Sequence, residues 1–214
     1  MSTALPTLSL LETRVLGTLV EKQHTVPDTY PLTLNALVSG CNQKTSRAPV
    51  MEATDTEVQA TLDNLKRLNL VIESSGGRVA RYAHNTDSVL KVPSQSVAIL
   101  TALMLRGPQT PGELRINCER LHRFADISAV EAFLQELSTR PAGPLVVQLA
   151  RLPGARENRW AHLLSGTPAA EPVRKEAQAE EKPVLGTDAL EARLARLEAE
   201  VAELRAALDK LRLQ

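Results

Sequence analysis

The sequence predicts a mainly α-helical fold with small β-hairpins, which belongs to the α+β class. The strongest observation is an internal repeat: the stretch Arg-Val-Ala-Arg-Tyr-Ala-His at 78–84 returns as Arg-Glu-Asn-Arg-Trp-Ala-His at 156–162. Upstream, residues 58–65 return in the same order at 130–137. Because both matches keep their order, we infer one structural unit used twice. A leucine heptad near the C-terminus predicts a separate coiled-coil helix.

The first copy is predicted to contain three helices and a hairpin. Its first helix has an apolar stripe at helical spacing, made of Leu8, Leu11, Val15 and Leu19. Pro31 is expected to start the second helix, where its missing N–H is no loss. Thr54 and Glu57 form a capping box that opens the third helix. Strands at 70–72 and 79–82 then flank a Ser-Ser-Gly-Gly turn, which predicts a hairpin.

The second copy repeats this plan. Its first helix carries a stripe formed by Val97, Leu100 and Met104. Residues 110–111 open the second helix, and Ser128 with Glu131 is predicted to be the capping box of the third. A longer hairpin joins 145–149 to 160–164. Three helices and a two-stranded wing form the winged-helix variant of helix-turn-helix, so we predict two such domains in tandem.

The spacing of the matches sets the domain boundaries. First-helix positions such as Val15 and Ile99 lie 84 residues apart, whereas third-helix positions such as Val58 and Val130 lie 72 apart. We therefore expect about 12 extra residues in the first copy, near Gly40 to Ala53. The predicted organisation is a first domain at 1–92, a second at 93–166, a flexible linker at 167–186 and a coiled-coil helix at 187–214.

Composition limits the classes of function. The chain has 25 basic and 25 acidic side chains. Residues 1–92 carry nine of each, and residues 93–166 carry eight basic and six acidic. A domain that grips DNA through phosphates usually has a basic excess, so charge alone does not support DNA binding. The sequence shows no secretory signal and no apolar run near the ~20 residues of a membrane span, so we expect a cytoplasmic protein.

The C-terminal heptads predict self-association. Apolar residues alternate at steps of four and three, at Leu190, Leu194, Leu197, Val201, Leu204, Leu208 and Leu211. A single amphipathic helix has no core of its own and is marginal in water. We expect a homodimer through this helix, with folding back onto a domain as the alternative.

Two groups of polar residues are candidate contacts for a nucleic acid or a protein partner. The first lies in the extra segment of copy one and contains Asn42, Gln43, Lys44 and Arg47. The second lies on the wings and contains Arg78, Arg81, Arg156 and Arg159. Within each wing pair the two arginines are three apart, so they point to opposite faces of the strand and one can brace the fold.

Other patterns argue against further chemistry. The third helices begin with carboxylates, such as Asp55, Glu57 and Asp126, which disfavours standard reading of the major groove. Cys118 and His122 are four apart, but no further Cys or His has zinc-type spacing, so we expect no metal. We find no phosphate loop and no nucleophile motif, and we predict neither a cofactor nor enzymatic activity.

Several strings are specific enough to indicate a family. Glu-Lys-Gln at 21–23, Cys-Asn-Gln-Lys at 41–44 and Arg-Gly-Pro-Gln-Thr-Pro-Gly-Glu-Leu-Arg at 106–115 strongly resemble the YceH-like family of bacterial proteins. One departure is Ala48, where an acidic residue is typical of that family. The resemblance covers nearly the whole chain and implies two winged-helix domains in a cytoplasmic protein. It supplies no biochemical function.

Two functions remain open at the level of sequence. The first is regulatory binding of double-stranded DNA by a dimeric tandem winged-helix protein, with Lys44, Arg47, Arg78 and Arg81 at phosphates. The second is a protein-interaction or assembly module. A continuous basic surface on both wings would favour DNA, whereas mixed charge with an exposed apolar patch would favour a protein partner.

Overall fold

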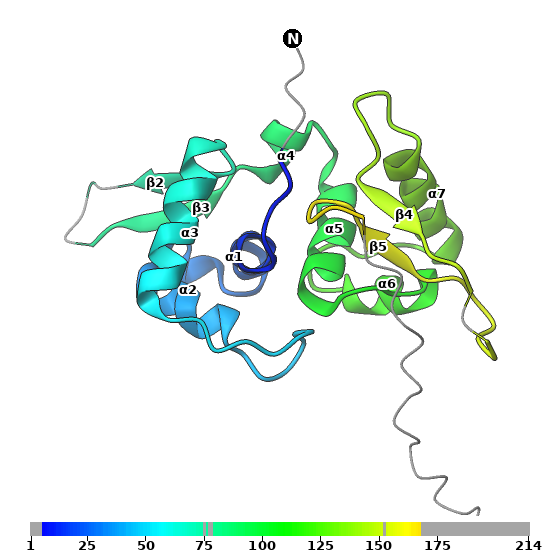
Figure 1. Cartoon of the computed structure of the whole chain (residues 1–214), viewed down its shortest axis with the longest axis horizontal. Coiled ribbons are helices and arrows are strands. Elements are labelled where there is room, and N and C mark those ends of the chain that lie inside the picture. Colours follow the sequence, from blue (N-terminus) through cyan, green and yellow to red (C-terminus); the bar gives the residue numbers. More distant parts are fainter. Residues whose placement is uncertain (1–5, 75, 77–78, 152, 168–214) are drawn as a thin grey trace, which may run out of the picture. The chain divides into compact units, whose positions relative to one another are not determined.

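The computed structural model describes residues 6–74, 76, 79–151 and 153–167 (Figure 1). These residues form a mixed α+β fold with seven α-helices, one 3-10 helix and small antiparallel sheets. The first half contains α1 (Leu10–Thr25), η1 (Pro27–Thr29), β1 (Leu32–Thr33), α2 (Leu34–Cys41), α3 (Asp55–Arg67), β2 (Val71–Ser74), β3 (Arg81–His84) and α4 (Thr86–Leu90). The second half contains α5 (Ser94–Arg106), α6 (Pro111–Asn117), α7 (Ile127–Ser138), β4 (Val146–Gln148) and β5 (Trp160–His162).

Each half places three helices before an antiparallel hairpin. In the first half the strand order is β1-β3-β2, with Leu32 opposite Tyr82 and Val71 opposite His84. In the second half β4 pairs with β5, and Gln109 forms a single bridge to Trp160 where the first half has β1. This arrangement is consistent with a winged-helix-like fold.

Side-chain caps decide where the helices begin. The capping box that opens α3 at Thr54 is confirmed, and so is the start of α6 at Thr110, where the structure also shows a capping box with Glu113. The prediction for the second helix was wrong: α2 begins at Leu34 and not at Pro31, because the Thr33 side chain accepts the Ala36 N–H.

The prediction for the third helix of the second half was also wrong. The Asp126 carboxylate accepts the Ala129 N–H, so α7 begins at Ile127. The Ser128 hydroxyl donates to Asp126 at 2.8 Å and caps nothing. A carboxylate two residues earlier in the chain took the position that the sequence assigned to the hydroxyl.

The extra length of the first half is divided between two connections and the longer helices α1 and α2. The path from the first to the second helix runs over 26–33 in the first half and over 107–110 in the second. The path from the second to the third helix runs over 42–54 and 118–126 respectively. The extra residues are therefore not confined to the stretch near Gly40 to Ala53.

The core continues from one half into the other. Every residue from Glu12 to Val20 of α1 is buried, and so is every residue from Ser96 to Leu105 of α5. A helix buried on all sides packs against more than its own unit. The two helices pack together, and a Cβ at Gly17 would lie only 3.0 Å from Leu105 Cδ2. The described residues all lie in one compact unit, which spans 1–169.

Two sequence predictions concern residues that the structure describes only in part. The linker and the heptad helix fall at 167–214, of which the structure describes only Thr167. Within the part of the chain that is described, no helix is long and apolar enough to cross a membrane.

Candidate functional site

The predicted contact residues between α2 and α3 are mostly used by the fold. The Asn42 side chain exchanges two hydrogen bonds of 2.8 Å with the backbone of Ala53. The Gln43 amide oxygen accepts from Arg47 at 2.9 Å and from Lys22 at 3.4 Å. Lys44 is exposed. Of this group, Lys44 alone presents its side chain to solvent.

Arg47 is internal. Its side chain is 0% exposed and forms an ion pair with Glu21, with Nη2 2.6 Å from Oε2 and Nη1 3.1 Å from Oε1. The same guanidinium also donates to the Gly40 carbonyl, from Nε at 3.2 Å and from Nη2 at 3.0 Å. Burial alone would raise the pKa of Glu21, but the hydrogen bond and charge of Arg47 outweigh it and lower that pKa. A guanidinium committed in this way has no free edge for a phosphate.

The second arginine of each wing braces its own half. Arg81 donates to the carbonyls of Thr29 at 3.2 Å and Pro31 at 2.8 Å. Arg159 donates to the Pro108 carbonyl at 2.7 Å and pairs with Glu113 at 2.9 Å. Both arginines therefore hold the connection that precedes the second helix of their half. This shared structural role explains why the motif occurs in both copies.

The structure describes the first arginine of only one wing. Arg78 lies outside the described residues. Arg156 is exposed and lines an open groove of about 740 Å³ between α7 and the wing of the second half. The groove is also lined by Ser128, Glu131, Gln135, Gln148, Arg151, Glu157 and Asn158. It therefore offers two guanidinium groups and three side-chain amides, beside two carboxylates.

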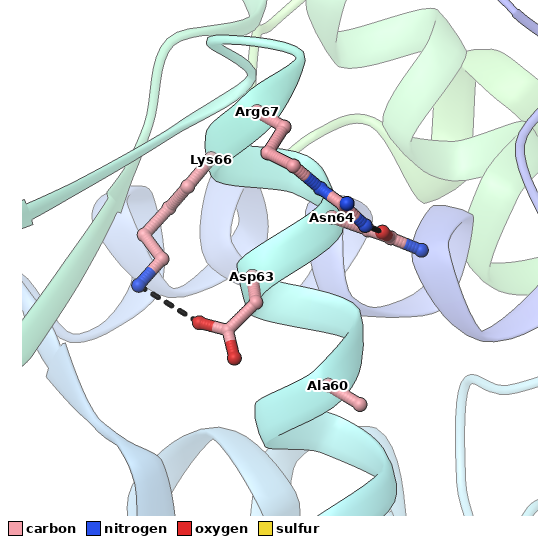
Figure 2. A pocket seen from close by; sticks show the side chains of 5 residues that line it. All are labelled: Ala60, Asp63, Asn64, Lys66 and Arg67. Carbon is pink, nitrogen blue, oxygen red and sulfur yellow. Dashed lines mark hydrogen bonds and ion pairs between the residues drawn. The ribbon is translucent and has the colours of Figure 1, made fainter.

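The corresponding helix of the first half carries a different surface. Exposed carboxylates on α3 include Asp55 and Glu57 in its first turn and Asp63 nearer its end. Figure 2 shows Asp63 and Lys66 facing each other in a shallow hollow near the end of α3, and their charged atoms are 2.9 Å apart. Lys66 also lies 2.5 Å from Glu73, and hydrogen bonds to both carboxylates raise its pKa. Neighbouring carboxylates thus balance the charge of Lys66, so this face of α3 carries no excess of positive charge.

Sequence reasoning missed a second basic group on α6 and on the turn between α6 and α7. Arg115, Arg120 and Arg123 are all exposed there, and Arg115 donates to the Ala125 carbonyl at 3.2 Å. Their close spacing in the chain was the available signal. Two apolar side chains lie beside them: Ile116 is 71% exposed and Ile127 is 45% exposed.

The Cys118 and His122 pair has no ligand geometry. Cys118 is buried, and burial raises the pKa of its thiol to about 12. The His122 ring packs edge-on against Phe124. Among the described residues no group of three or more His, Cys, Asp or Glu side chains could hold a metal ion.

Fold and surface together define a mixed α+β protein that is consistent with a winged-helix-like fold and bears exposed arginines on its second half. The family model described as "Protein of unknown function, DUF480" matches residues 8–155, and the chain belongs to that family. This agrees with the resemblance to YceH-like proteins.

Curated relatives extend the match along the chain. A UPF0502 protein of Dechloromonas aromatica is 62% identical over 211 residues, which cover 97% of each chain. A UPF0502 protein of Methylibium petroleiphilum is 61% identical over 200 residues, covering 92% of this chain and 85% of the relative. One of Burkholderia multivorans is 68% identical over 163 residues, covering 76% and 69%.

Proposed function

We propose that the chain is a non-enzymatic regulatory protein, built from two tandem winged-helix units, that binds double-stranded DNA through its second unit. One observation carries the proposal: exposed arginines lie on α6 and the turn that leads into α7, and also on the wing that follows α7. They are Arg115, Arg120, Arg123, Arg151 and Arg156. Among the described residues none of the five takes part in an ion pair.

This placement matches what a winged helix needs on DNA. Contacts to phosphates fix the position of the protein, and the third helix between them meets base edges. The exposed face of α7 supplies Ser128 and Gln135, which can donate and accept hydrogen bonds. Its carboxylate Glu131 can accept from the amino group of cytosine.

The first unit is not the DNA-binding unit in this proposal. Arg47 and Arg81 serve the fold, and Lys66 on α3 is already paired with Asp63 and Glu73. Residues 93–166 carry eight basic and six acidic side chains, against nine of each in residues 1–92. The proposed contacts therefore move from Lys44 and Arg47 to the arginines of the second half.

Binding of a random duplex, followed by fluorescence anisotropy, tests the proposal. Wild-type affinity should fall steeply between about 50 and 200 mM salt, because bound phosphates release counterions. In the double variant Arg151→Ala with Arg156→Ala, affinity should fall and the salt slope should flatten by about two, roughly one for each lost phosphate contact.

Matched charge removal in the first half provides the control. Arg67→Gln with Lys91→Gln removes the same charge from exposed positions outside the proposed surface, so it should leave the salt slope unchanged. Lys44→Ala alone tests the contact predicted from sequence and should have little effect. Equal losses in the two double variants would mean that net charge, not a defined surface, drives binding.

A protein partner is the second candidate, and the exposed Ile116 and Ile127 favour it. A Cβ on Gly112 would lie 3.9 Å from Ile127 Cδ1, and Gly112 and Ile116 are one turn apart on α6, so the two isoleucines lie close together. No binding of duplex DNA at low salt would favour this candidate. Cross-linking from a photoreactive residue at position 116 would then identify the partner.

A further inference from the structure

The connection between α2 and α3 joins the two halves, in addition to the packing of α1 on α5. The Ala48 N–H donates to the Leu105 carbonyl at 2.8 Å, and Arg106 Nη2 donates to the Ser46 hydroxyl at 2.8 Å. Leu105 and Arg106 are the last two residues of α5, where backbone carbonyls lack partners inside the helix. A segment of the first half thus caps the end of a helix of the second half.

The same connection is also bonded to the first half, through Arg47, which lies between Ser46 and Ala48. Ser46 and Ala48 bond to the second half, whereas Arg47 turns inward to Glu21 of α1 and the Gly40 carbonyl of α2. Three consecutive residues therefore alternate between the halves. The position of the outer two depends on where the Arg47 guanidinium is held.

A second buried arginine holds the connection at its start and near its middle. Arg14 of α1 is fully buried and donates to the Cys41 carbonyl at 3.1 Å and to the Pro49 carbonyl at 2.7 Å. Burial lowers the pKa of Arg14, and the nearby charge of Arg47 lowers it further. Placing two guanidinium groups in the interior is expensive unless their hydrogen bonds are met. Both guanidinium groups donate to backbone carbonyls at the end of α2, and Arg14 also donates to Pro49, so together they hold this one connection in place.

We propose that residues 42–52 form a strap that locks the second half to the first, and that the ion pair between Arg47 and Glu21 is its latch. The light-blue connection between α2 and α3 extends toward α5 in Figure 1. With the latch closed, α3 and α7 move as parts of one body. With the latch open, the strap releases the end of α5 and the halves unfold as separate units.

The aromatic residues of the chain provide a test without labels. Both tyrosines, Tyr30 and Tyr82, lie in the first half, and the single tryptophan, Trp160, lies in the second. The heptad segment contains neither residue type, so it is silent in this measurement. Urea unfolding of the full chain, followed by tyrosine emission and by Trp160 emission, reports the two halves separately.

In the wild type we expect the two curves to coincide, because coincident transitions mark one cooperative unit. Glu21→Gln keeps the shape of the side chain but removes the charge that faces Arg47. It should separate the two midpoints or lower the urea slope at both probes, since that slope scales with the surface exposed in one cooperative step. Arg106→Met removes the hydrogen bond from the second half to Ser46 of the strap. It should likewise separate the midpoints or lower the urea slope.

Lys66→Met is the matched control, because it breaks an ion pair of the first half away from the strap. It should leave the curves coincident and their slopes unchanged. If Glu21→Gln fails to fold, Arg106→Met decides the question. Coincident curves of wild-type slope in the folded strap variants would overturn the proposal. So would separate curves in the wild type, or the same separation in Lys66→Met.

Discussion

The arginines of this chain do different work according to what surrounds each guanidinium group. Arg47 is internal and pairs with Glu21. Arg81 and Arg159 are exposed at the surface but reach back to backbone carbonyls. Arg156 faces solvent at the edge of a groove. The sequence motif does not distinguish these arginines. Their partners in the structure show which of them brace the fold and which can contact a ligand.

His162 is the residue whose charge should matter most to stability near neutral pH. It lies on β5, its Nδ1 atom has no hydrogen-bond partner among the described residues, and burial lowers its pKa to about 4. The unfolded chain has an ordinary histidine pKa of about 6.5. Between these values the unfolded state binds a proton that the folded state does not, so stability falls as pH drops below about 6.5.

We therefore expect His162→Gln to reduce the pH dependence of folding. From pH 7 to 5, wild-type stability should fall by an extra amount on the order of 1–2 kcal/mol relative to the variant, at about 1.4 kcal/mol per pKa unit. Urea unfolding followed by Trp160 emission at both pH values measures the difference. His84 also has a pKa lowered by burial and remains in both proteins, so its contribution cancels. An identical fall in the variant would contradict this account.

At the scale of elements, the helices depend on caps and on close approach. Gly40 of α2 lies against α1, and a Cβ there would come 2.6 Å from Thr18 Cγ2. The Gly40 carbonyl also accepts from Arg47. Gly112 of α6 is different, because a Cβ there would meet its nearest atoms at 3.9 Å, which is ordinary contact.

These two glycines give a matched pair of predictions. Gly40→Ala should destabilise the protein by about 1–3 kcal/mol, the usual cost of overpacking. Gly112→Ala should be neutral or stabilising by up to about 1 kcal/mol, because alanine favours a helix over glycine. Denaturant unfolding of both variants measures the difference. A stabilised Gly40→Ala would show that α2 can shift away from α1 without cost.

At the scale of the whole molecule, the described residues form one packed unit and not two separately packed domains. The strap and the α1–α5 contact both cross between the halves. A DNA duplex bound by the second half would therefore meet a first half held at a fixed position. The exposed arginines of α6, of the turn before α7 and of the second wing give that arrangement one arginine-bearing surface.

The heptad segment carries the prediction about assembly. Its seven apolar positions lie outside the described residues, and the homodimer stays a prediction. Light scattering should give twice the chain mass of 23.3 kDa, and Leu197→Asp with Leu204→Asp should give the single-chain mass. A wild-type monomer would favour the alternative, in which this segment folds back onto a domain.

The sequence by itself determined the repeat, the order of helices and hairpins, and the caps at Thr54 and Thr110. These are local properties: periodicity and capping depend on residues within a few positions of one another. It also identified the wing arginines, and it allowed for one member of each pair to brace the fold. It failed at Pro31 and Ser128, because a nearby side chain, Thr33 in one case and Asp126 in the other, caps the helix from a different position.

The tertiary structure decided which polar residues remain available. Arg47 looked like a surface cation in a polar segment, but Glu21, twenty-six positions away, holds it inside. Arg115, Arg120 and Arg123 were not singled out from the sequence, yet folding leaves all three exposed, on α6 and on the turn that follows it. The burial of α1 and α5 on every side likewise required both halves to be in place. Burial and ion pairing depend on residues that are distant in the chain, and these contacts determine which charges a partner can reach.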